Sequence, residues 1–230
     1  MKLASIPTNN TYAIGDIHGC LKSLKSLLST LPLNQDSVLI FLGDYIDRGP
    51  DSKGVIDFLI QLSTRYQCYF LVGNHEVMMA DALKSGKTES WELNGARQTL
   101  ASYVQDDAFV FELPESHALF LDRTEWFIDT PDFFFVHAGA NPFRKLGESV
   151  AQERWDDFVW ERSHLPVEKP VWEKTVVCGH TPHKHPLIKE KLIVIDTGCV
   201  YVNSKKYAGY GHLTAIQLPS KKIFMVRNCE

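Results

Sequence analysis

The sequence predicts an α/β fold, in which short buried strands alternate with amphipathic helices. Its 230 residues are 44% hydrophobic and 11% aromatic, which suits one globular domain covering residues 1–230. The hydrophobic periodicity changes repeatedly between strand-like and helix-like segments, and the sequence contains no internal repeat, low-complexity tract or Gly/Ser linker. These observations favour a folded catalytic or binding domain over a fibrous or disordered chain.

The first third of the chain predicts two strand–helix–strand units. Tyr12-Ala-Ile-Gly15 is a short apolar run typical of a buried strand, and leucines then recur at helical spacing from Leu21 to Leu31. Residues 37–42 predict a second buried strand, residues 53–64 an amphipathic helix, and residues 67–72 a third strand. The order of these elements favours two consecutive βαβ units.

The rest of the chain predicts a helical middle followed by more strands. Residues 77–121 mix helical spacing with loop residues, and the polar stretch 84–90 within them is expected to be exposed. We expect structure that selects the substrate in this middle part. The last two of the later strands are separated by Pro219-Ser220 and should form a hairpin. The later strands are expected at residues 133–136, 175–178, 192–196, 213–218 and 222–226.

The composition argues against several classes of protein. The formal charge of −4 does not suit a chain that holds nucleic acid by bulk electrostatics. No run of eighteen apolar residues is present, and the N-terminus lacks the apolar segment of a signal peptide, so we expect a soluble, cytoplasmic protein without a membrane span. The five cysteines are odd in number and never form a CxxC pair, which predicts reduced thiols.

Acidic and histidine clusters follow directly after five of the predicted strands. In open α/β sheets, ligands bind beyond the carboxyl ends of the strands, so these five loops can converge on one crevice. The glycines that flank the clusters allow the backbone to turn sharply and to approach a ligand closely. The clusters are Gly15-Asp-Ile-His-Gly19, Gly43-Asp-Tyr-Ile-Asp-Arg-Gly49, Gly73-Asn-His-Glu76, His137-Ala-Gly139 and Gly179-His-Thr-Pro182.

The side chains in these clusters are suited to binding metal ions. Asp16 and His18 are two residues apart, so at the end of an extended strand they point to the same side. Carboxylate, imidazole and amide oxygen together suit Mn²⁺, Fe or Zn²⁺, whereas Mg²⁺ and Ca²⁺ rarely use so many imidazoles. The six candidate ligands are Asp16, His18, Asp44, Asn74, His137 and His180.

Six ligands are too many for one tetrahedral ion, whereas two ions that share one carboxylate would use them all. Two divalent ions carry four positive charges, and Asp16 and Asp44 supply only two negative charges. The remaining charge can hold a hydroxide and a phosphate. The sequence therefore predicts a two-metal phosphoesterase centre.

The motifs GDIHG, GDYIDRG, GNHE, HAG and GHTP, in this order, span Gly15 to Pro182. This ordered set resembles the metallophosphoesterase, or calcineurin-like, superfamily, and specifically its PPP-type serine/threonine protein phosphatases in a form similar to the compact bacterial and phage enzymes. The resemblance implies a four-layer αββα fold, in which two packed mixed β-sheets are flanked by helices. It also implies two divalent metal ions, with Mn²⁺ expected first.

Carried over to this sequence, the resemblance implies a role for each metal ligand. Asp16 and His18 would hold the first ion, and Asp44 would bridge the two ions. The second ion would be completed by the remaining ligands. These are Asn74, His137 and His180.

The resemblance also implies catalytic residues around the metal ions. His75 is similar to the general acid of the family, and Asp47 would orient its imidazole. Arg48 would clamp the phosphate through a forked pair of hydrogen bonds. A second phosphate-binding arginine is expected between the HAG and GHTP motifs. Arg162 is the best match, with Arg144 and Arg154 as competitors.

The activity that this resemblance implies is hydrolysis of phosphoserine and phosphothreonine monoesters in a phosphoprotein or phosphopeptide. A hydroxide that bridges the ions would attack phosphorus in line, and His75 would protonate the leaving alkoxide. The sequence departs from the eukaryotic members, because it has HAG in place of their HGG and Leu71-Val72 in place of their Leu-Arg. Eukaryotic regulatory partners are therefore not carried over.

The main alternative is a symmetrical diadenosine tetraphosphate hydrolase, or another small-molecule phosphoesterase of the same superfamily. The chain resembles that hydrolase in GDIHG and in Asp196-Thr-Gly-Cys199, whereas Asp47 and Glu76 favour the protein phosphatase. A nuclease or cyclic-nucleotide phosphodiesterase usually has GHxH, where this chain has GHTP. A catalytically dead phosphoprotein-binding module is disfavoured because every expected ligand is retained.

Residues outside the motifs are expected to be structural. Asp196 could support the metal ligands or form an Asx turn, and both interpretations stay open. The five other histidines should be exposed or hydrogen-bonded structural residues. They are His117, His164, His183, His185 and His212.

Overall fold

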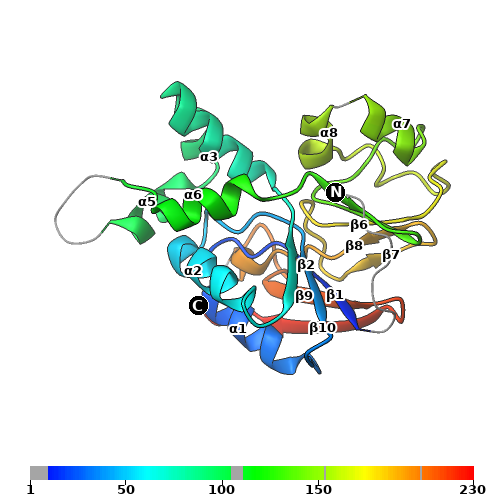
Figure 1. The fold of residues 1–230 in the computed structure, drawn as a ribbon, viewed down its shortest axis with the longest axis horizontal. Coiled ribbons are helices and arrows are strands. Elements are labelled where there is room, and N and C mark those ends of the chain that lie inside the picture. The colour runs from blue at the N-terminus through cyan, green and yellow to red at the C-terminus, as the bar shows by residue number, and fades with distance from the viewer. Residues whose placement is uncertain (1–9, 105–110, 153, 203) are drawn as a thin grey trace.

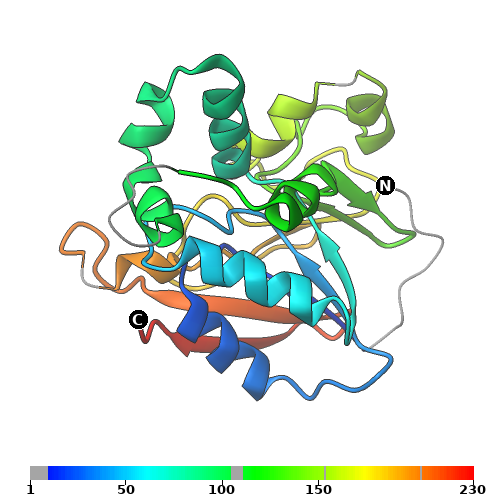
Figure 2. The same cartoon turned by 60° about the vertical axis from the view of Figure 1, so that its left-hand side comes forward.

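The computed structural model describes residues 10–104, 111–152, 154–202 and 204–230, and these form two mixed β-sheets flanked by helices (Figures 1 and 2). Each sheet has five strands among the described residues. The predicted α/β class and the pair of sheets are therefore confirmed. Among the described residues, no helix combines the length and the apolar character needed to cross a bilayer.

The first sheet has the strand order β10-β9-β1-β2-β3. Its parallel strands are β1 (Thr11–Ile14), β2 (Val38–Phe41) and β3 (Gln67–Phe70), which are joined by α1 (Leu21–Thr30) and α2 (Ser52–Leu62). The two predicted βαβ units are thus present, with bounds within two residues of those expected. The predicted hairpin is formed by the antiparallel strands β9 (His212–Leu218) and β10 (Lys222–Arg227).

The second sheet has the strand order β4-β5-β6-β8-β7. Its three central strands are parallel, and they are β5 (Phe133–Val136), β6 (Thr175–Cys178) and β8 (Leu192–Val194). The antiparallel edges are β4 (Phe127–Asp129) and β7 (Leu187–Ile188), which the sequence analysis did not identify. With three and two residues, these strands are too short to show an alternating pattern.

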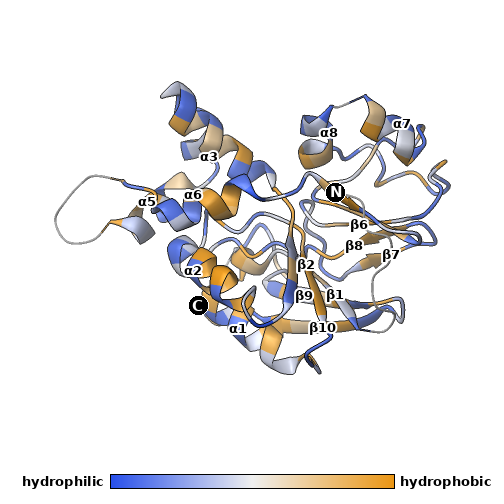
Figure 3. Cartoon of the chain, in the orientation of Figure 1, coloured by the Kyte–Doolittle hydropathy of each residue, from blue (hydrophilic) through white to orange (hydrophobic). Residues whose placement is uncertain are grey.

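Three apolar clusters hold the four layers together. The middle cluster lies between the two sheets. Ile40 of β2 and Leu42, which follows β2, pack there with Phe135 of β5 and Val177 of β6. The outer face of the first sheet packs on α1 and α2, and the outer face of the second packs on residues such as Phe158. Figure 3 shows the strands as mainly hydrophobic and the outward helix surfaces as hydrophilic. Burial on both faces explains why β2, β5 and β8 are continuous apolar runs in the sequence, whereas β3, at the edge of its sheet, is only partly buried.

The middle of the chain forms helices beside the first sheet (Figure 1). The stretch 84–90 is mostly exposed, as predicted. The helices of this region are α3 (Asn74–Ser85), α4 (Glu89–Leu93), α5 (Ala96–Tyr103) and α6 (Glu115–Asp122). The remaining helices, beside the second sheet and after β8, are α7 (Leu146–Ala151), α8 (Trp155–Trp160) and the 3₁₀ turn η1 (Cys199–Tyr201).

Candidate metal centre

The loops that follow the parallel strands of both sheets meet at one place. Asp16 follows β1, Asp44 follows β2, and Asn74 begins α3 just after β3. His137 follows β5, and His180 lies two residues after β6. Because all of these strands are parallel within their sheets, their carboxyl ends bring the loops together, as the sequence predicts.

The backbone of these loops adopts a conformation that side chains usually avoid. Six non-glycine residues have positive φ among the described residues, and five of them belong to the motif loops. Left-handed φ costs free energy for residues with a Cβ atom, and such strain persists only where the surrounding contacts impose it. The five residues and their φ angles are His18 (47°), Asp44 (52°), Asp47 (70°), Arg48 (69°) and His180 (65°).

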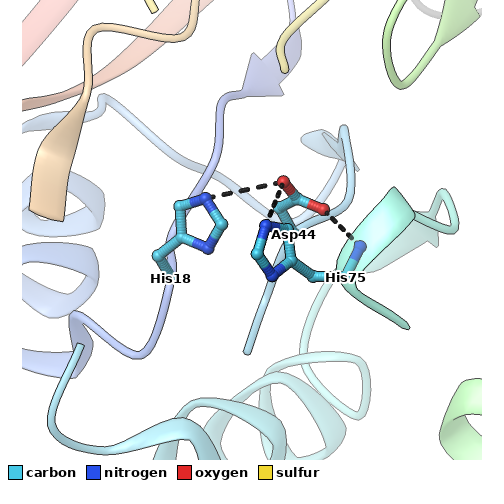
Figure 4. Close-up of side chains that lie close together, drawn as sticks. All are labelled: His18, Asp44 and His75. Carbon is cyan, nitrogen blue, oxygen red and sulfur yellow. Dashed lines mark hydrogen bonds and ion pairs between the residues drawn. The ribbon is translucent and has the colours of Figure 1, made fainter. Parts of the chain in front are cut away.

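The carboxylate of Asp44 is at the middle of the centre. His18 Nε2 lies 3.5 Å from Asp44 Oδ2, and His137 Nε2 lies 3.4 Å from Asp44 Oδ1. Figure 4 shows that the carboxylate also faces His75, whose Nε2 is 4.0 Å from Oδ2 and whose backbone N–H donates to Oδ1 at 3.2 Å. This central position is the one expected of a carboxylate shared by two ions.

A second set of ligand atoms surrounds Asn74. Its Oδ1 lies 3.0 Å from His137 Nε2 and 2.9 Å from His180 Nδ1. Both carboxylate oxygens of Asp16 accept the backbone N–H of His180, at 3.0 and 3.1 Å. All six predicted ligands are therefore brought to one place.

Two groups of side chains could each hold an ion, because their ligand atoms lie within 4.8 Å of one another. One group consists of Asp44, His137 and His180, as the sequence predicts. The other consists of His18, Asp44 and His75, so that His75 stands close to where a metal ligand would be expected. The resemblance had assigned His75 to proton transfer, and the distances allow either role.

The electrostatics of the centre suit divalent cations. Asp16, Asp44 and Asp196 are buried close together; burial, together with the repulsion between carboxylates, raises the pKa of Asp44 to about 7 and that of Asp16 well above its usual range. Burial, with a contribution from nearby cationic groups, lowers the pKa of His137 to about 4 and that of His18 well below its usual range. A cation bound here would stabilise the charged form of the buried carboxylates, and the neutral imidazoles have nitrogen lone pairs free to bind it. Mixed carboxylate and imidazole ligands of this kind suit Mn²⁺, Fe or Zn²⁺.

The unused hydrogen-bonding atoms agree with that conclusion. His75 Nε2 and His180 Nε2 are buried and have no hydrogen-bond partner among the described residues. Buried polar nitrogen atoms are normally satisfied, and such exceptions often mark a missing water or ion. The residues of the centre therefore fit two divalent ions.

Asp47 connects His75 to the helices of the middle region. Asp47 Oδ2 lies 2.6 Å from His75 Nδ1, and Asp47 Oδ1 accepts hydrogen bonds from Thr99 Oγ1 at 2.6 Å and Trp91 Nε1 at 3.0 Å. Burial raises the pKa of Asp47 to about 7 and lowers the pKa of His75. The sequence analysis predicted the Asp47–His75 contact but missed Trp91 and Thr99.

Glu76 organises the backbone of the second motif. Its carboxylate accepts the N–H groups of Gly73 at 2.9 Å, Asp44 at 2.9 Å and Tyr45 at 2.8 Å. A glutamate three residues after a helix N-cap can accept the backbone N–H of the N-cap residue, and Glu76 does so from Gly73; because glycine has no side chain, only this half of a capping box is present. The sequence analysis used Glu76 only as a mark of substrate class.

The structure separates the three candidate arginines. Arg162 Nε donates to Thr181 Oγ1 at 3.2 Å, beside His180, and its side chain is exposed. Arg144 instead bonds Gln152, and Arg154 forms an ion pair with Asp157. Arg162 is therefore the one that lies next to the centre. Arg48 also lies there, because its Nη1 is 2.7 Å from His18 Nε2.

The remaining histidines lie outside both groups of ligand atoms found among the described residues. His117 is hydrogen-bonded to Tyr103 and Asp57, and His183 to the backbone oxygen of Thr181. Asp196 accepts the N–H of Gly198 at 2.8 Å, as expected of an Asx turn, and its charge repels that of Asp16 and raises the pKa of that carboxyl.

Comparison with known proteins identifies the family. The model of the calcineurin-like phosphoesterase family matches residues 10–212. The asymmetrical bis(5′-nucleosyl)-tetraphosphatase PrpE of Oceanobacillus iheyensis is 29% identical, over 93% of this chain and 90% of that protein. Serine/threonine-protein phosphatase 1 of Salmonella typhimurium is 28% identical, over 84% of this chain and 88% of that protein.

Two further comparisons add detail. The symmetrical bis(5′-nucleosyl)-tetraphosphatase of Ralstonia nicotianae is 35% identical, over 64% of this chain and 47% of that protein. A crystal structure of a candidate diadenosine tetraphosphatase has a TM-score of 0.72 at 23% identity, covering 100% of this chain and 98% of that chain. At that level of identity the structural likeness shows the fold alone.

Proposed function

This chain belongs to the calcineurin-like phosphoesterase family, and we propose that it is a two-metal hydrolase of dinucleoside tetraphosphates. The observation that carries the proposal is the match to an asymmetrical tetraphosphatase over nine-tenths of both chains, together with the two groups of candidate ligands that share Asp44. The sequence alone favoured a phosphoprotein phosphatase. The relatives support its alternative, a bis(5′-nucleosyl)-tetraphosphatase, better.

The residues that would hold the ions surround Asp44, which would be shared between them. Asp16 and His18 would complete one site, and the other would be completed by Asn74, His137 and His180. When bound, divalent ions neutralise phosphate oxygens and lower the pKa of a coordinated water towards neutrality. Mn²⁺ is the ion that we propose first, for its match to mixed carboxylate and imidazole ligands.

His75 is placed to give a proton to the leaving group. Its Nδ1 is held by Asp47 at 2.6 Å, and therefore its Nε2 is the ring atom that faces Asp44. A proton on Nε2 can pass to the oxygen of the departing nucleotide as its bond to phosphorus breaks. Trp91 and Thr99 fix the carboxylate of Asp47, so that the imidazole keeps this orientation.

Two arginines flank the place where the phosphate chain would lie. Arg48, from the second motif, reaches His18, and Arg162, from the segment between the last two motifs, reaches Thr181. A guanidinium offers a forked pair of donors that matches two phosphate oxygens. Because a tetraphosphate carries several phosphate groups, both arginines can bind it at the same time.

The experiment that tests the proposal is a substrate panel. The purified protein is assayed with Mn²⁺ on diadenosine tetraphosphate, a phosphoserine peptide and p-nitrophenyl phosphate. We expect kcat/KM to be highest for the dinucleotide, and product analysis then separates ADP alone from ATP with AMP. A strong preference for the phosphoserine peptide would overturn the proposal in favour of a phosphoprotein phosphatase.

One structural feature favours that second candidate, a phosphoserine and phosphothreonine phosphatase. A groove of about 590 Å³ between α3, α6 and the start of α8 has apolar lining from Met79 and Trp126. Besides the buried Glu76, its lining includes three further acidic side chains, for which no ion pair occurs among the described residues. Such a groove would suit a basic peptide better than a polyanion. The three side chains are Asp81, Asp122 and Asp156.

A further inference from the structure

A second cavity lies directly against Arg48. It has a volume of about 380 Å³ and is bounded by the end of α4, the start of α5 and the η1 turn. Figure 2 shows the loop after β8, in orange, on the same side of the molecule as α5. Since Arg48 also contacts His18, the cavity and the metal centre share this arginine. A molecule bound at the centre could therefore extend into the cavity.

The walls of the cavity combine apolar and aromatic side chains. Leu93, at the end of α4, lines the cavity and is 88% exposed, so its apolar side chain is free to contact a ligand. Opposite α4, the ring of Tyr201 lies with its centre 5.9 Å from Arg48 Cζ, in a cation–π contact. The volume falls within the range of small-molecule pockets, about 300–1,000 Å³.

Tyr201 is held in place by a cluster of tyrosines on its own loop. The rings of Tyr201 and Tyr207 are 4.4 Å apart at an angle of 31°, and Tyr207 meets Tyr210 edge-on at 5.5 Å. Packing of this kind limits the motion of the Tyr201 ring, so that less entropy is lost when a flat ligand stacks on it. The loop thus offers a preorganised aromatic surface.

The polar groups of the cavity suit a neutral heterocycle next to a phosphate. Gln98 lines it and offers both a donor and an acceptor, as the edge of a nucleobase requires. No carboxylate is among the described lining residues, in contrast to the acidic groove beside α3. The loop carries two exposed lysines, Lys205 and Lys206, which add positive charge nearby.

We propose that this cavity binds a nucleobase of the substrate, stacked on Tyr201 and covered by Leu93. The phosphate chain would then cross Arg48 and reach the metal centre. This inference rests on the proposed function and deepens it, because it names the part of the chain that recognises a nucleotide. Aromatic stacking contributes to base binding whatever the identity of the base.

The first test compares a substrate that carries nucleobases, diadenosine tetraphosphate, with one that carries none, p-nitrophenyl phosphate. Tyr201→Ala should lower the ratio of kcat/KM for diadenosine tetraphosphate to that for p-nitrophenyl phosphate about tenfold, which is the expected size of one lost stacking contact. Leu93→Ser should lower the same ratio through the loss of its apolar contact with the base. Tyr201→Phe keeps the ring and should keep the ratio. Leu119→Ser, on α6 and 46% exposed, is the matched control. An unchanged ratio in both cavity variants would overturn the inference.

The second test does not depend on hydrolysis of the dinucleotide. AMP and ribose 5-phosphate are compared as inhibitors of p-nitrophenyl phosphate hydrolysis by the Mn²⁺-loaded protein, because they differ only in the base. We expect AMP to inhibit about tenfold more strongly, and this advantage to disappear in Tyr201→Ala.

Comparing AMP with ribose 5-phosphate distinguishes failure of the base site from failure of the proposed function. An AMP advantage in a protein that does not cleave diadenosine tetraphosphate would support the base site and remove the proposed function. Cleavage of the dinucleotide with equal inhibition by AMP and ribose 5-phosphate would support the function and remove the base site.

Discussion

Asp47 Oδ2 and His75 Nδ1 are 2.6 Å apart, in a pair that is almost completely buried. The other carboxylate oxygen of Asp47 is held by Thr99 Oγ1 and by Trp91 Nε1, so the carboxylate has little freedom to rotate. His75 Nε2 has no hydrogen-bond partner among the described residues. The pair therefore presents His75 Nε2, without a hydrogen-bond partner, to the centre. The first prediction tests whether this nitrogen transfers a proton or binds a metal ion.

His75→Asn tests whether that nitrogen transfers a proton. We expect the loss of kcat to be about 10²-fold or more with phenyl phosphate, whose leaving group needs a proton, and much smaller with p-nitrophenyl phosphate. Metal analysis by mass spectrometry should still find two ions in the variant. Loss of one ion would instead show that His75 is a ligand together with His18 and Asp44, as the distances also allow.

Glu76→Gln tests the role of the buried carboxylate in shaping the second motif. The two oxygens of Glu76 accept the N–H groups of Gly73, Asp44 and Tyr45, and a glutamine would place an NH₂ group against one or more of these donors. We expect a loss of roughly 2–3 kcal/mol in unfolding free energy, which corresponds to a fall of about 5–10 °C in Tm. Glu115→Gln, on the exposed face of α6, is the control and should leave Tm within about 1 °C.

Much of the fold follows from local signals in the sequence. The strands β1, β2 and β3 are short and mainly apolar, and each is followed by a motif with a flanking glycine. Because parallel strands end at the same edge of a sheet, the order of the motifs was enough to predict that their side chains meet. The two short edge strands β4 and β7 carry no such signal, because they pair with the sheet at its edges through only a few residues.

The residues around Asp47 could not be predicted in this way. Trp91 and Thr99 are 44 and 52 residues from Asp47 in sequence, and helical periodicity does not indicate which distant loop a helix faces. The sequence could not decide the substrate class for a related reason. Asp47 and Glu76 were interpreted as marks of a protein phosphatase, yet their contacts are with His75 and with the backbone of the motifs, and these contacts serve any phosphate ester.

Gly95→Ala tests whether the position of Arg48 matters for catalysis. A Cβ atom on Gly95 would lie 2.7 Å from Arg48 Cγ and 2.9 Å from Arg48 N, and therefore the arginine would have to move. We expect kcat/KM to fall about tenfold or more for every phosphate substrate, the loss of a positioned guanidinium being worth more than 1 kcal/mol.

Gly86→Ala is the matched control for the backbone. Gly95 and Gly86 both have positive φ, at +111° and +73°, but nothing lies within 4 Å of a Cβ atom on Gly86. Left-handed strain should cost each variant about 1 kcal/mol of stability, and Gly95→Ala should lose more because its Cβ atom also meets the backbone nitrogen of Arg48. Only Gly95→Ala should lose activity, and an equal loss in both would mean that strain and not Arg48 is responsible.

Asp44→Asn tests whether one carboxylate serves both ions. His18 and His137 approach opposite oxygens of Asp44, at 3.5 and 3.4 Å. Replacing one charged oxygen by an amide nitrogen removes a ligand and a negative charge from both sites together. We expect metal analysis to find fewer than one ion per chain in the variant. Retention of two ions would rule out the shared carboxylate.

Removal of the metal ions should destabilise the wild-type protein for an electrostatic reason. Asp16, Asp44 and Asp196 are buried close together, and burial with mutual repulsion raises the pKa of Asp16 and Asp44. Ions present at about 100 times their dissociation constant stabilise a protein by about 3 kcal/mol. Treatment with a chelator at neutral pH should therefore lower Tm by roughly 5–10 °C, as measured by differential scanning fluorimetry.

The Tm of the metal-free Asp44→Asn variant tests whether repulsion between these carboxylates destabilises the protein. The variant lacks one of the three clustered carboxylates, whereas its amide oxygen can still accept the backbone N–H of His75. Its Tm should therefore change little on chelation, and the metal-free variant should melt at or above the metal-free wild type. If the metal-free variant instead melts several degrees lower, the repulsion between Asp44 and its neighbours is not what the ions relieve.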